Sequence, residues 1–236
     1  MKHRLKILLL IFVLTQISVH AQKIGFEEID SSKVRPWLPK LTNEYQMVYH
    51  FGESEMESDF VLLICFGKYY AQIKSGQFSD DGKSYIWNFE NLTNVRIEGN
   101  KFYSDKTNGE FVQYDNGKET LNGLKVYKPW SGITENNEFE IGVQSYPVTK
   151  FYFGKFPQAS LNFLNEDELK QISKNDLKIM RNEIYARYGY EFKAGSEMDL
   201  YFKKQSWYIK QHENVGKFLT DLEKKNIKLI QNIENK

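Results

Sequence analysis

Apolar and polar residues alternate with a period of two along much of the chain before residue 128. Such alternation is typical of β-strands that bury one face. The strands predicted in this way contain Tyr45, Met47, Tyr49 and Phe51; Tyr69, Ala71 and Ile73; and Tyr85, Trp87 and Phe89. Residues 60–66 are apolar at nearly every position, which predicts a central strand with both faces buried.

Turn dipeptides separate these strands from further ones. Gly99 and Asn100 lie between two short apolar stretches and predict a tight hairpin. Asn-Gly pairs precede further strands at residues 111–114 and 121–127. Closely spaced strands with tight turns predict an antiparallel meander that closes as a small barrel or folds as a sandwich. Residues 128–158 carry several prolines and are predicted as loop and linker, with a candidate last strand at residues 151–153.

The spacing becomes helical after Ala159. Ser173 is a predicted N-cap, and the apolar residues that follow it recur on one helix face: Leu177, Met180, Ile184 and Tyr188. A second helix is predicted from Ser196 and a third from Thr220, where Thr220 and Glu223 have the spacing of a capping box. The predicted fold class is therefore α+β, with an antiparallel β meander followed by a small three-helix module.

The first of these helices has a predicted stop. Gly189 suits the left-handed position just after the helix, and Tyr185 and Tyr190 then stand where a Schellman end makes its hydrophobic contact. Glu183 and Arg187 are spaced i,i+4 in the favourable order for an ion pair.

The N-terminus has the features of a secretory signal. Lys2, Arg4 and Lys6 precede an apolar run that is too short to span a bilayer, and Ala21 ends a cleavage-site pattern. We therefore expect a signal peptide at residues 1–21, a β-rich domain at 35–158 and a helical domain at 160–235. The exported chain is expected in the periplasm or outside the cell, without a lipid anchor and without a transmembrane span.

The net charge and the cysteine content exclude some classes of partner and some sources of stability. Removal of the signal leaves 29 basic and 31 acidic residues, a net charge of −2, which argues against nucleic acid as a partner. The single cysteine, Cys65, lies in an apolar run and is expected to be a buried thiol rather than part of a disulfide.

Few residues suggest catalysis. His50 and His212 are the histidines after the signal, and both are expected to be solvated rather than part of a Ser-His-Asp site. An acidic run from Glu53 to Asp59 is either a solvated loop or a weak calcium site, and we favour the loop. We expect no metal and no cofactor. The many Tyr and Trp rings of the β half either form its core or line a groove.

Several separated pieces of the helical half resemble the YARHG domain, a small helical module of bacterial secreted and surface proteins. Its signature Tyr-Ala-Arg-His-Gly reads here Tyr185, Ala186, Arg187, Tyr188 and Gly189, so tyrosine replaces the histidine. The segments 180–184, 201–208 and 222–227 also fit, and the resemblance covers residues 160–235. It implies an envelope location and carries no established activity.

Arg181, Asn182 and Arg187 lie on the polar side of the predicted helix. They either form a site for a small anion or a peptide carboxylate, or they bind loop carbonyls and neutralise the helix end. Tyr185, Ala186, Tyr188 and Gly189 are expected to be structural. We expect a non-catalytic binding protein whose partner is an envelope protein, peptide or glycan. The alternatives are an envelope hydrolase acting on glycan or peptide, and a carrier of a small apolar ligand in the β domain.

Overall fold

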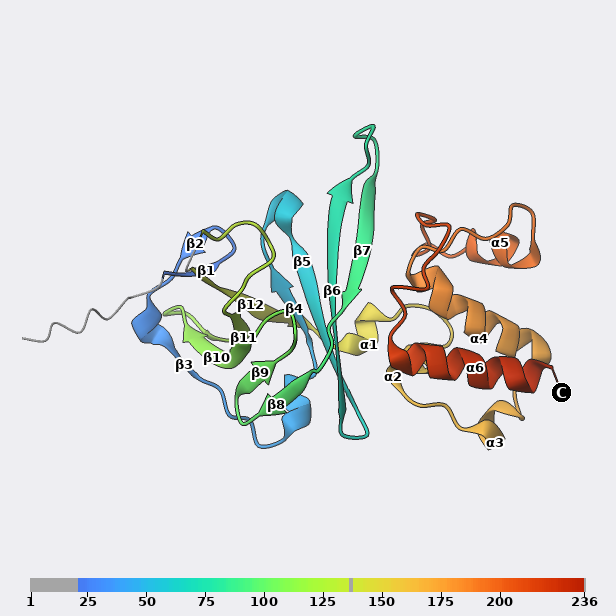
Figure 1. The fold of residues 1–236 in the computed structure, drawn as a ribbon, viewed down its shortest axis with the longest axis horizontal. Coiled ribbons are helices and arrows are strands. Elements are labelled where there is room, and N and C mark those ends of the chain that lie inside the picture. The colour runs from blue at the N-terminus through green and yellow to red at the C-terminus, as the bar shows by residue number, and fades with distance from the viewer. Residues whose placement is uncertain (1–20, 136–137, 236) are drawn as a thin grey trace, which may run out of the picture.

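The structure is a computed structural model that describes residues 21–135 and 138–235. The expected signal peptide, apart from Ala21, lies outside these residues. Within them a β part is followed by a helical part, and the helices lie beyond the β6–β7 side of the sheet (Figure 1). The predicted α+β fold class is confirmed.

The strands of the described chain form one sheet in which β7-β6-β5-β4-β12-β11-β10-β9-β8 are neighbours. Their bounds are β1 (Gln22–Ile24), β2 (Glu27–Glu28), β3 (Val34–Pro36), β4 (Val48–Phe51), β5 (Ser58–Cys65), β6 (Lys68–Phe78), β7 (Tyr85–Asn91), β8 (Arg96–Glu98), β9 (Lys101–Tyr103), β10 (Gly109–Asp115), β11 (Thr120–Val126) and β12 (Phe139–Tyr146). Two antiparallel meanders, β4 to β7 and β8 to β12, are thus joined where β12 pairs with β4.

The sheet is not closed into a barrel, so that alternative is wrong. Its path ends at β7 and β8, and no ladder in the described residues joins these two strands. Only residues 92–95 connect them, which keeps the two ends within about 18 Å of each other. The sheet therefore curls, and its two meanders share one core.

Aromatic side chains fill this shared core. Phe60 and Leu62 of β5 pack in the same cluster as Phe102 and Phe111 of the other meander. The Tyr45 ring stacks on Phe111 with centroids 3.8 Å apart. Because these rings are buried against one another, they serve as core rather than as the lining of a groove.

The opposite face of β5 is also buried, as predicted for residues 60–65, whereas Phe66 lies in the turn after β5 and is 84% exposed. Val61, Leu63 and Cys65 pack against Val148 and Leu222 of the helical part. Cys65 is a free, buried thiol, as expected. The central strand is apolar on both faces because the second meander covers one face and the helices cover the other.

Three predictions in the β part are wrong. Residues 128–158 are not only loop, because they contain β12, which lies at the centre of the sheet. The candidate strand at 151–153 is absent, because Phe151 ends a short helix, α1 (Val148–Phe151), and Tyr152 and Phe153 follow it without regular structure. The first predicted strand also begins later than expected, at Val48. Tyr45 is instead the last residue of a 3-10 helix, and its ring packs into the core. Three such helices occur in the described chain, at Ser31–Lys33, Thr42–Tyr45 and Ser54–Met56.

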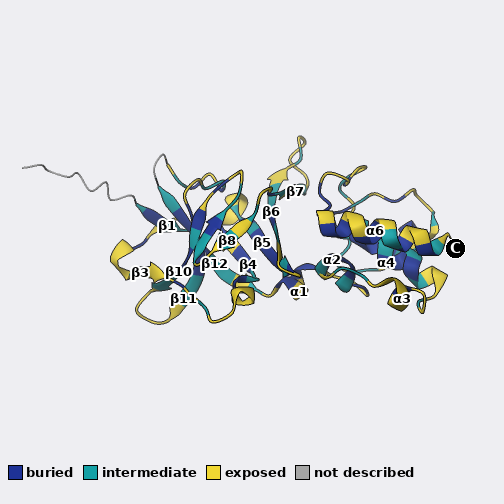
Figure 2. Ribbon diagram, turned by 60° about the horizontal axis from the view of Figure 1, so that its bottom comes forward, coloured by how far each residue is buried: buried dark blue, intermediate teal, exposed yellow. Residues whose placement is uncertain are grey.

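The helical part contains the three predicted helices and shorter ones before them. The helices after α1 are α2 (Gln158–Leu161), α3 (Glu166–Leu169), α4 (Lys174–Arg187), α5 (Glu197–Phe202) and α6 (Asp221–Glu234). The predicted caps are confirmed, since Ser173, Ser196 and Thr220 each accept a hydrogen bond from the backbone three residues later. Figure 2 shows buried residues where α4 and α6 face each other and exposed residues on their outer sides. The predicted domain boundaries stay a prediction.

The predicted Schellman end of α4 is confirmed. The Tyr190 N–H donates to the Tyr185 carbonyl at 3.2 Å, and the Gly189 N–H donates to the Ala186 carbonyl at 2.9 Å. Gly189 has φ +72°, and the Tyr185 and Tyr190 rings lie 5.9 Å apart between centroids. None of the helices in the described ranges is long and apolar enough to cross a membrane.

We expect Gly189→Ala to lower the free energy of unfolding more than Gly195→Ala, measured by urea unfolding. Both glycines have positive φ, which costs a residue with a Cβ about 1–2 kcal/mol. A Cβ at Gly189 would also meet the Ile209 carbonyl oxygen at 3.0 Å, whereas a Cβ at Gly195 meets nothing within 4 Å. Equal losses in the two variants would contradict the packed helix end.

Candidate functional site

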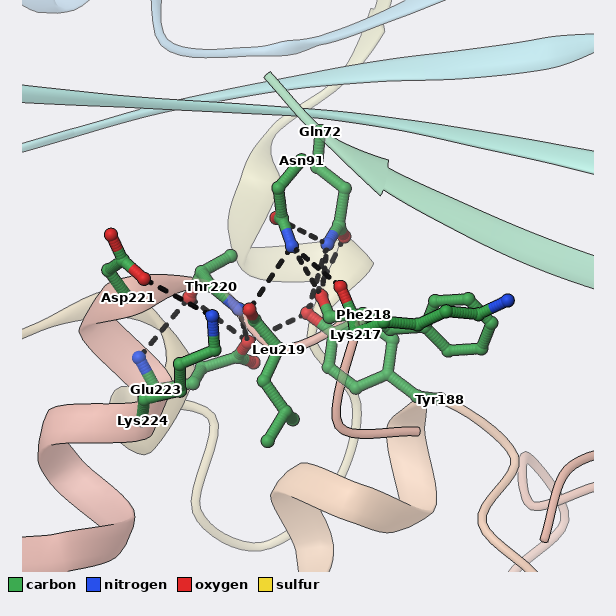
Figure 3. A network of polar contacts seen from close by, with 10 residues as sticks. All are labelled: Gln72, Asn91, Tyr188, Lys217, Phe218, Leu219, Thr220, Asp221, Glu223 and Lys224. Atoms are coloured by element: carbon green, nitrogen blue, oxygen red, sulfur yellow. Dashed lines mark hydrogen bonds and ion pairs between the residues drawn. The ribbon is translucent and has the colours of Figure 1, made fainter. Parts of the chain in front are cut away.

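A buried polar network joins the sheet to the helical part (Figure 3). Gln72 of β6 and Asn91 of β7 are partners across the two strands, and both amides point at the turn before α6. Gln72 Nε2 donates to the Phe218 carbonyl at 2.7 Å. Asn91 Nδ2 donates to the carbonyls of Phe218 and Leu219 at 3.0 and 3.1 Å. Two side chains of the sheet thus hold the backbone of the helical part.

Glu223 is the centre of this network on the helical side. Its carboxylate is fully buried and accepts from the Tyr188 hydroxyl at 2.8 Å, the Ser160 hydroxyl at 2.6 Å and the Thr220 N–H at 2.8 Å. Burial raises the pKa of Glu223, and these donors act in the opposite direction. Since the Tyr188 hydroxyl also lies 3.4 Å from Gln72 Nε2, polar contacts run without a break from β6 to α6.

The outer edge of β7 is also covered by the helical part. Gln211 Nε2 donates to the Tyr85 carbonyl at 2.8 Å, and Gln211 Oε1 accepts from the Trp87 N–H at 3.2 Å. These are the bonds that the backbone of a neighbouring strand would make. His212 Nε2 lies 2.7 Å from the Trp87 carbonyl oxygen, so this histidine contacts the sheet and is not the solvated loop residue that was expected.

Arg187 lies inside the helical part. Its side chain is 3% exposed and is paired with Glu183, as the i,i+4 spacing predicted. The guanidinium also donates to the Phe153 carbonyl at 2.6 Å and to the Ser160 hydroxyl at 2.8 Å. These contacts place Arg187 among the groups that hold the module together.

Glu183 fixes the segment that leads from the sheet into the helices. Its carboxylate accepts from the N–H groups of Lys155 and Phe156, both at 2.7 Å. Gly154 makes this approach feasible, because a Cβ there would lie 2.2 Å from the Glu183 carboxyl carbon. The buried ion pair therefore has its remaining acceptor positions filled, as a buried charge requires.

Two of the three predicted binding residues come together at the surface. Arg181 and Asn182 of α4 line a pocket of about 420 Å³ together with Tyr185 and Tyr190. Residues 213–216 form its other wall. This is the place in the helical part where residues predicted for binding are accessible.

The pocket residues keep hydrogen-bonding capacity. Arg181 Nε donates to Glu234 at 2.7 Å, and Asn182 Nδ2 donates to the Lys178 carbonyl at 2.7 Å, so neither binds a loop carbonyl. Among the described residues, no hydrogen bond involves the side-chain hydroxyls of Tyr185 and Tyr190 or the amide oxygen of Asn182. The pocket therefore offers donors, acceptors and two aromatic rings.

A Ser-His-Asp site is not assembled around His50. His50 Nδ1 lies 3.2 Å from Asp59, but the neighbouring Ser58 hydroxyl is buried and accepts from Trp130 Nε1 at 2.9 Å. In the described ranges, no three His, Cys, Asp or Glu side chains are grouped to hold a metal ion. The β interior is filled by the aromatic core, which leaves the carrier alternative without the open cavity that it requires.

Residues 155–235 match the family model of the YARHG domain. The predicted resemblance is thereby confirmed, and the YARHG match begins five residues before the predicted start at 160. No curated protein and no solved structure matches the chain. The YARHG domain occurs in secreted bacterial proteins, and it indicates an extracellular or periplasmic module that binds protein.

The contacts between the YARHG module and the sheet were not predicted. Gln72 lies between Ala71 and Ile73 and looks like an ordinary solvent-facing position of an alternating strand. Asn91 begins the sequence Asn91-Leu92-Thr93, which has the pattern of a glycosylation site, but its amide is used inside the protein. Only the pairing of distant segments gives these two residues their role.

We expect Tyr188→Phe to lower the free energy of unfolding by about 1–3 kcal/mol, because buried Glu223 loses a donor. Tyr185→Phe is the matched control, since the Tyr185 hydroxyl has no partner in the described chain and its loss should leave stability unchanged. Urea unfolding of residues 22–236 measures both. Equal stability of the two variants would contradict the assigned role of the Tyr188 hydroxyl.

The hydrogen bond to Asp59 raises the pKa of His50 above 6.5. A raised pKa in the folded state means that this contribution is present below about pH 6.5 and is lost as pH rises through the folded pKa. The stability difference between wild type and His50→Asn should therefore shrink from about pH 6 to about pH 8. It should stay below about 1 kcal/mol, because the His50 side chain is 43% exposed. A difference that grows over this range would contradict the ion pair.

Proposed function

We propose that this protein is exported to the bacterial envelope as a non-catalytic binding protein, and that it contacts a protein partner through the pocket beside α4. The observation that carries this proposal is the division of the YARHG residues. Arg181, Asn182, Tyr185 and Tyr190 open onto one pocket. Glu183, Arg187 and Tyr188 are used inside the molecule.

The composition of the pocket favours a protein partner. Tyrosine and arginine are enriched at protein interfaces, where a rigid ring supplies contact area and its hydroxyl supplies a hydrogen bond. Tyr185 and Tyr190 provide such rings. Arg181 is held by Glu234, so its guanidinium is already positioned before a partner arrives.

The attachment of the YARHG module to the sheet supports the same proposal. Gln72 and Asn91 bind the turn before α6, and Gln211 and His212 bind the edge of β7. A module held at two separate places presents its pocket in a fixed orientation, which lowers the entropy lost on binding. The β part then serves as the platform for this pocket.

A photoreactive amino acid in place of Glu213 tests this proposal. Glu213 is exposed and lines the pocket, whereas Lys118 is exposed in a hairpin turn of the β part and serves as the control position. We expect irradiation in a bacterial envelope extract to give a discrete protein adduct from position 213 and not from position 118. Mass spectrometry identifies the adduct.

Arg181→Ala in the same background should abolish the adduct without lowering the melting temperature by more than a few degrees, because its ion pair with Glu234 is partly exposed. Arg187→Ala should lower the melting temperature by more than Arg181→Ala does, because it leaves Glu183 buried without its charge partner. Adducts that form equally from both positions, or that survive Arg181→Ala, would overturn the assignment of the pocket.

A further inference from the structure

A second hollow lies where the sheet and the YARHG module meet. β7 ends at Asn91, which pairs with Gln72, so the first residues of β6 have no neighbouring strand on that side. The chain leaves β7 through residues 92–95 and crosses to β8. A groove of about 470 Å³ remains between β6, this crossing segment and the start of α6. We call it the junction groove.

The junction groove contains an open strand edge. The Ala71 carbonyl accepts from the Leu92 N–H at 2.9 Å, so Ala71 directs its main-chain groups away from β5. Residues two apart in a strand point the same way, and Tyr69 therefore also faces the groove. The contacts of Ile64, the partner of Tyr69 on β5, support this direction. The Ile64 N–H donates to Gln46 Oε1, on the side of β5 away from β6, so it does not bond to Tyr69. No strand in the described ranges pairs with Tyr69 on this edge.

The groove is rimmed by lysines. Lys217 and Lys224 line it, and Lys68 and Lys225 line an adjoining hollow of about 360 Å³. Asp221 is the acidic residue that lines both, and it lies 3.2 Å from Lys224. Four cations and one carboxylate give a local charge of +3 on a chain that is close to neutral overall. Figure 3 shows Lys217, Asp221 and Lys224 on the side of the YARHG module.

We propose that the junction groove binds an extended acidic peptide segment of a partner protein. One residue of the peptide pairs its main-chain N–H and C=O groups with those of Tyr69, in the manner of strand addition to a sheet edge. Acidic side chains of the peptide lie against Lys217 and Lys224. The open edge favours a peptide over an acidic glycan, because a glycan has no amide backbone to continue the ladder.

The junction groove is separate from the pocket beside α4, since the two share no lining residue. A peptide in it would contact β6 and the start of α6 together. Binding would therefore strengthen the attachment of the YARHG module to the sheet.

Calorimetry with residues 22–236 and a blocked pentapeptide that alternates glutamate and valine tests the proposal. We expect binding that weakens with salt, and no binding of the same peptide with glutamine in place of glutamate. The variant Lys217→Ala/Lys224→Ala should weaken binding by about tenfold, since two exposed ion pairs are removed. The control Lys193→Ala/Lys204→Ala removes the same charge from exposed positions outside the groove and should leave affinity unchanged. Circular dichroism confirms that both variants are folded.

A pentapeptide that is N-methylated at its central residue tests the strand pairing. It keeps the charges and loses one N–H, so its affinity should fall by about tenfold. Three results would overturn the proposal: no binding of the acidic peptide, equal losses in the two lysine variants, or equal affinity for the N-methylated peptide. Binding of oligogalacturonate in the last case would mean that the groove binds anions by charge alone. Arg181→Ala should leave this binding unchanged, so failure here is distinct from failure of the pocket beside α4.

Discussion

The buried carboxylate of Glu223 is the constraint on which the joining of the two parts depends. A carboxylate away from water has to receive several hydrogen bonds, and the donors to Glu223 come from Ser160, Tyr188 and Thr220. These residues belong to α2, the end of α4 and the start of α6, so one side chain fixes three segments of the YARHG module. The Tyr188 hydroxyl extends the network to Gln72 on the sheet.

This arrangement explains the YARHG signature in physical terms. Arg187 and Glu183 form a buried pair whose other contacts hold the entry segment, and Gly189 allows the chain to turn after α4. Tyrosine at position 188 cannot exchange a proton near neutral pH as a histidine can, but its hydroxyl donates a hydrogen bond to Glu223. Arg181, Asn182, Tyr185 and Tyr190 line the surface pocket instead.

The docking of the YARHG module also determines which strand edges of the β part are covered. The YARHG module covers the edge of β7 with the side-chain amide of Gln211, and this protects a strand that would otherwise expose unpaired backbone groups. β7 in turn covers the edge of β6 only as far as Gln72, and the first residues of β6 stay open beside Lys217 and Lys224. The junction groove is therefore a direct result of β6 being longer than β7.

The sequence by itself determined the local features, because each depends on neighbouring residues. These are the caps at Ser173, Ser196 and Thr220, the helix end at Gly189, and the strand β5 with its two apolar faces. The prediction missed β12 although Phe139, Ile141 and Val143 alternate with Glu140, Gly142 and Gln144, because the prolines on either side of this segment indicated a loop. It placed Arg181 and Asn182 on the polar side of the helix, where they line a pocket, but could not show that Arg187 points inward. The roles of Gln72, Asn91 and Gln211 were decided only by the tertiary structure, because their partners lie more than a hundred residues away along the chain.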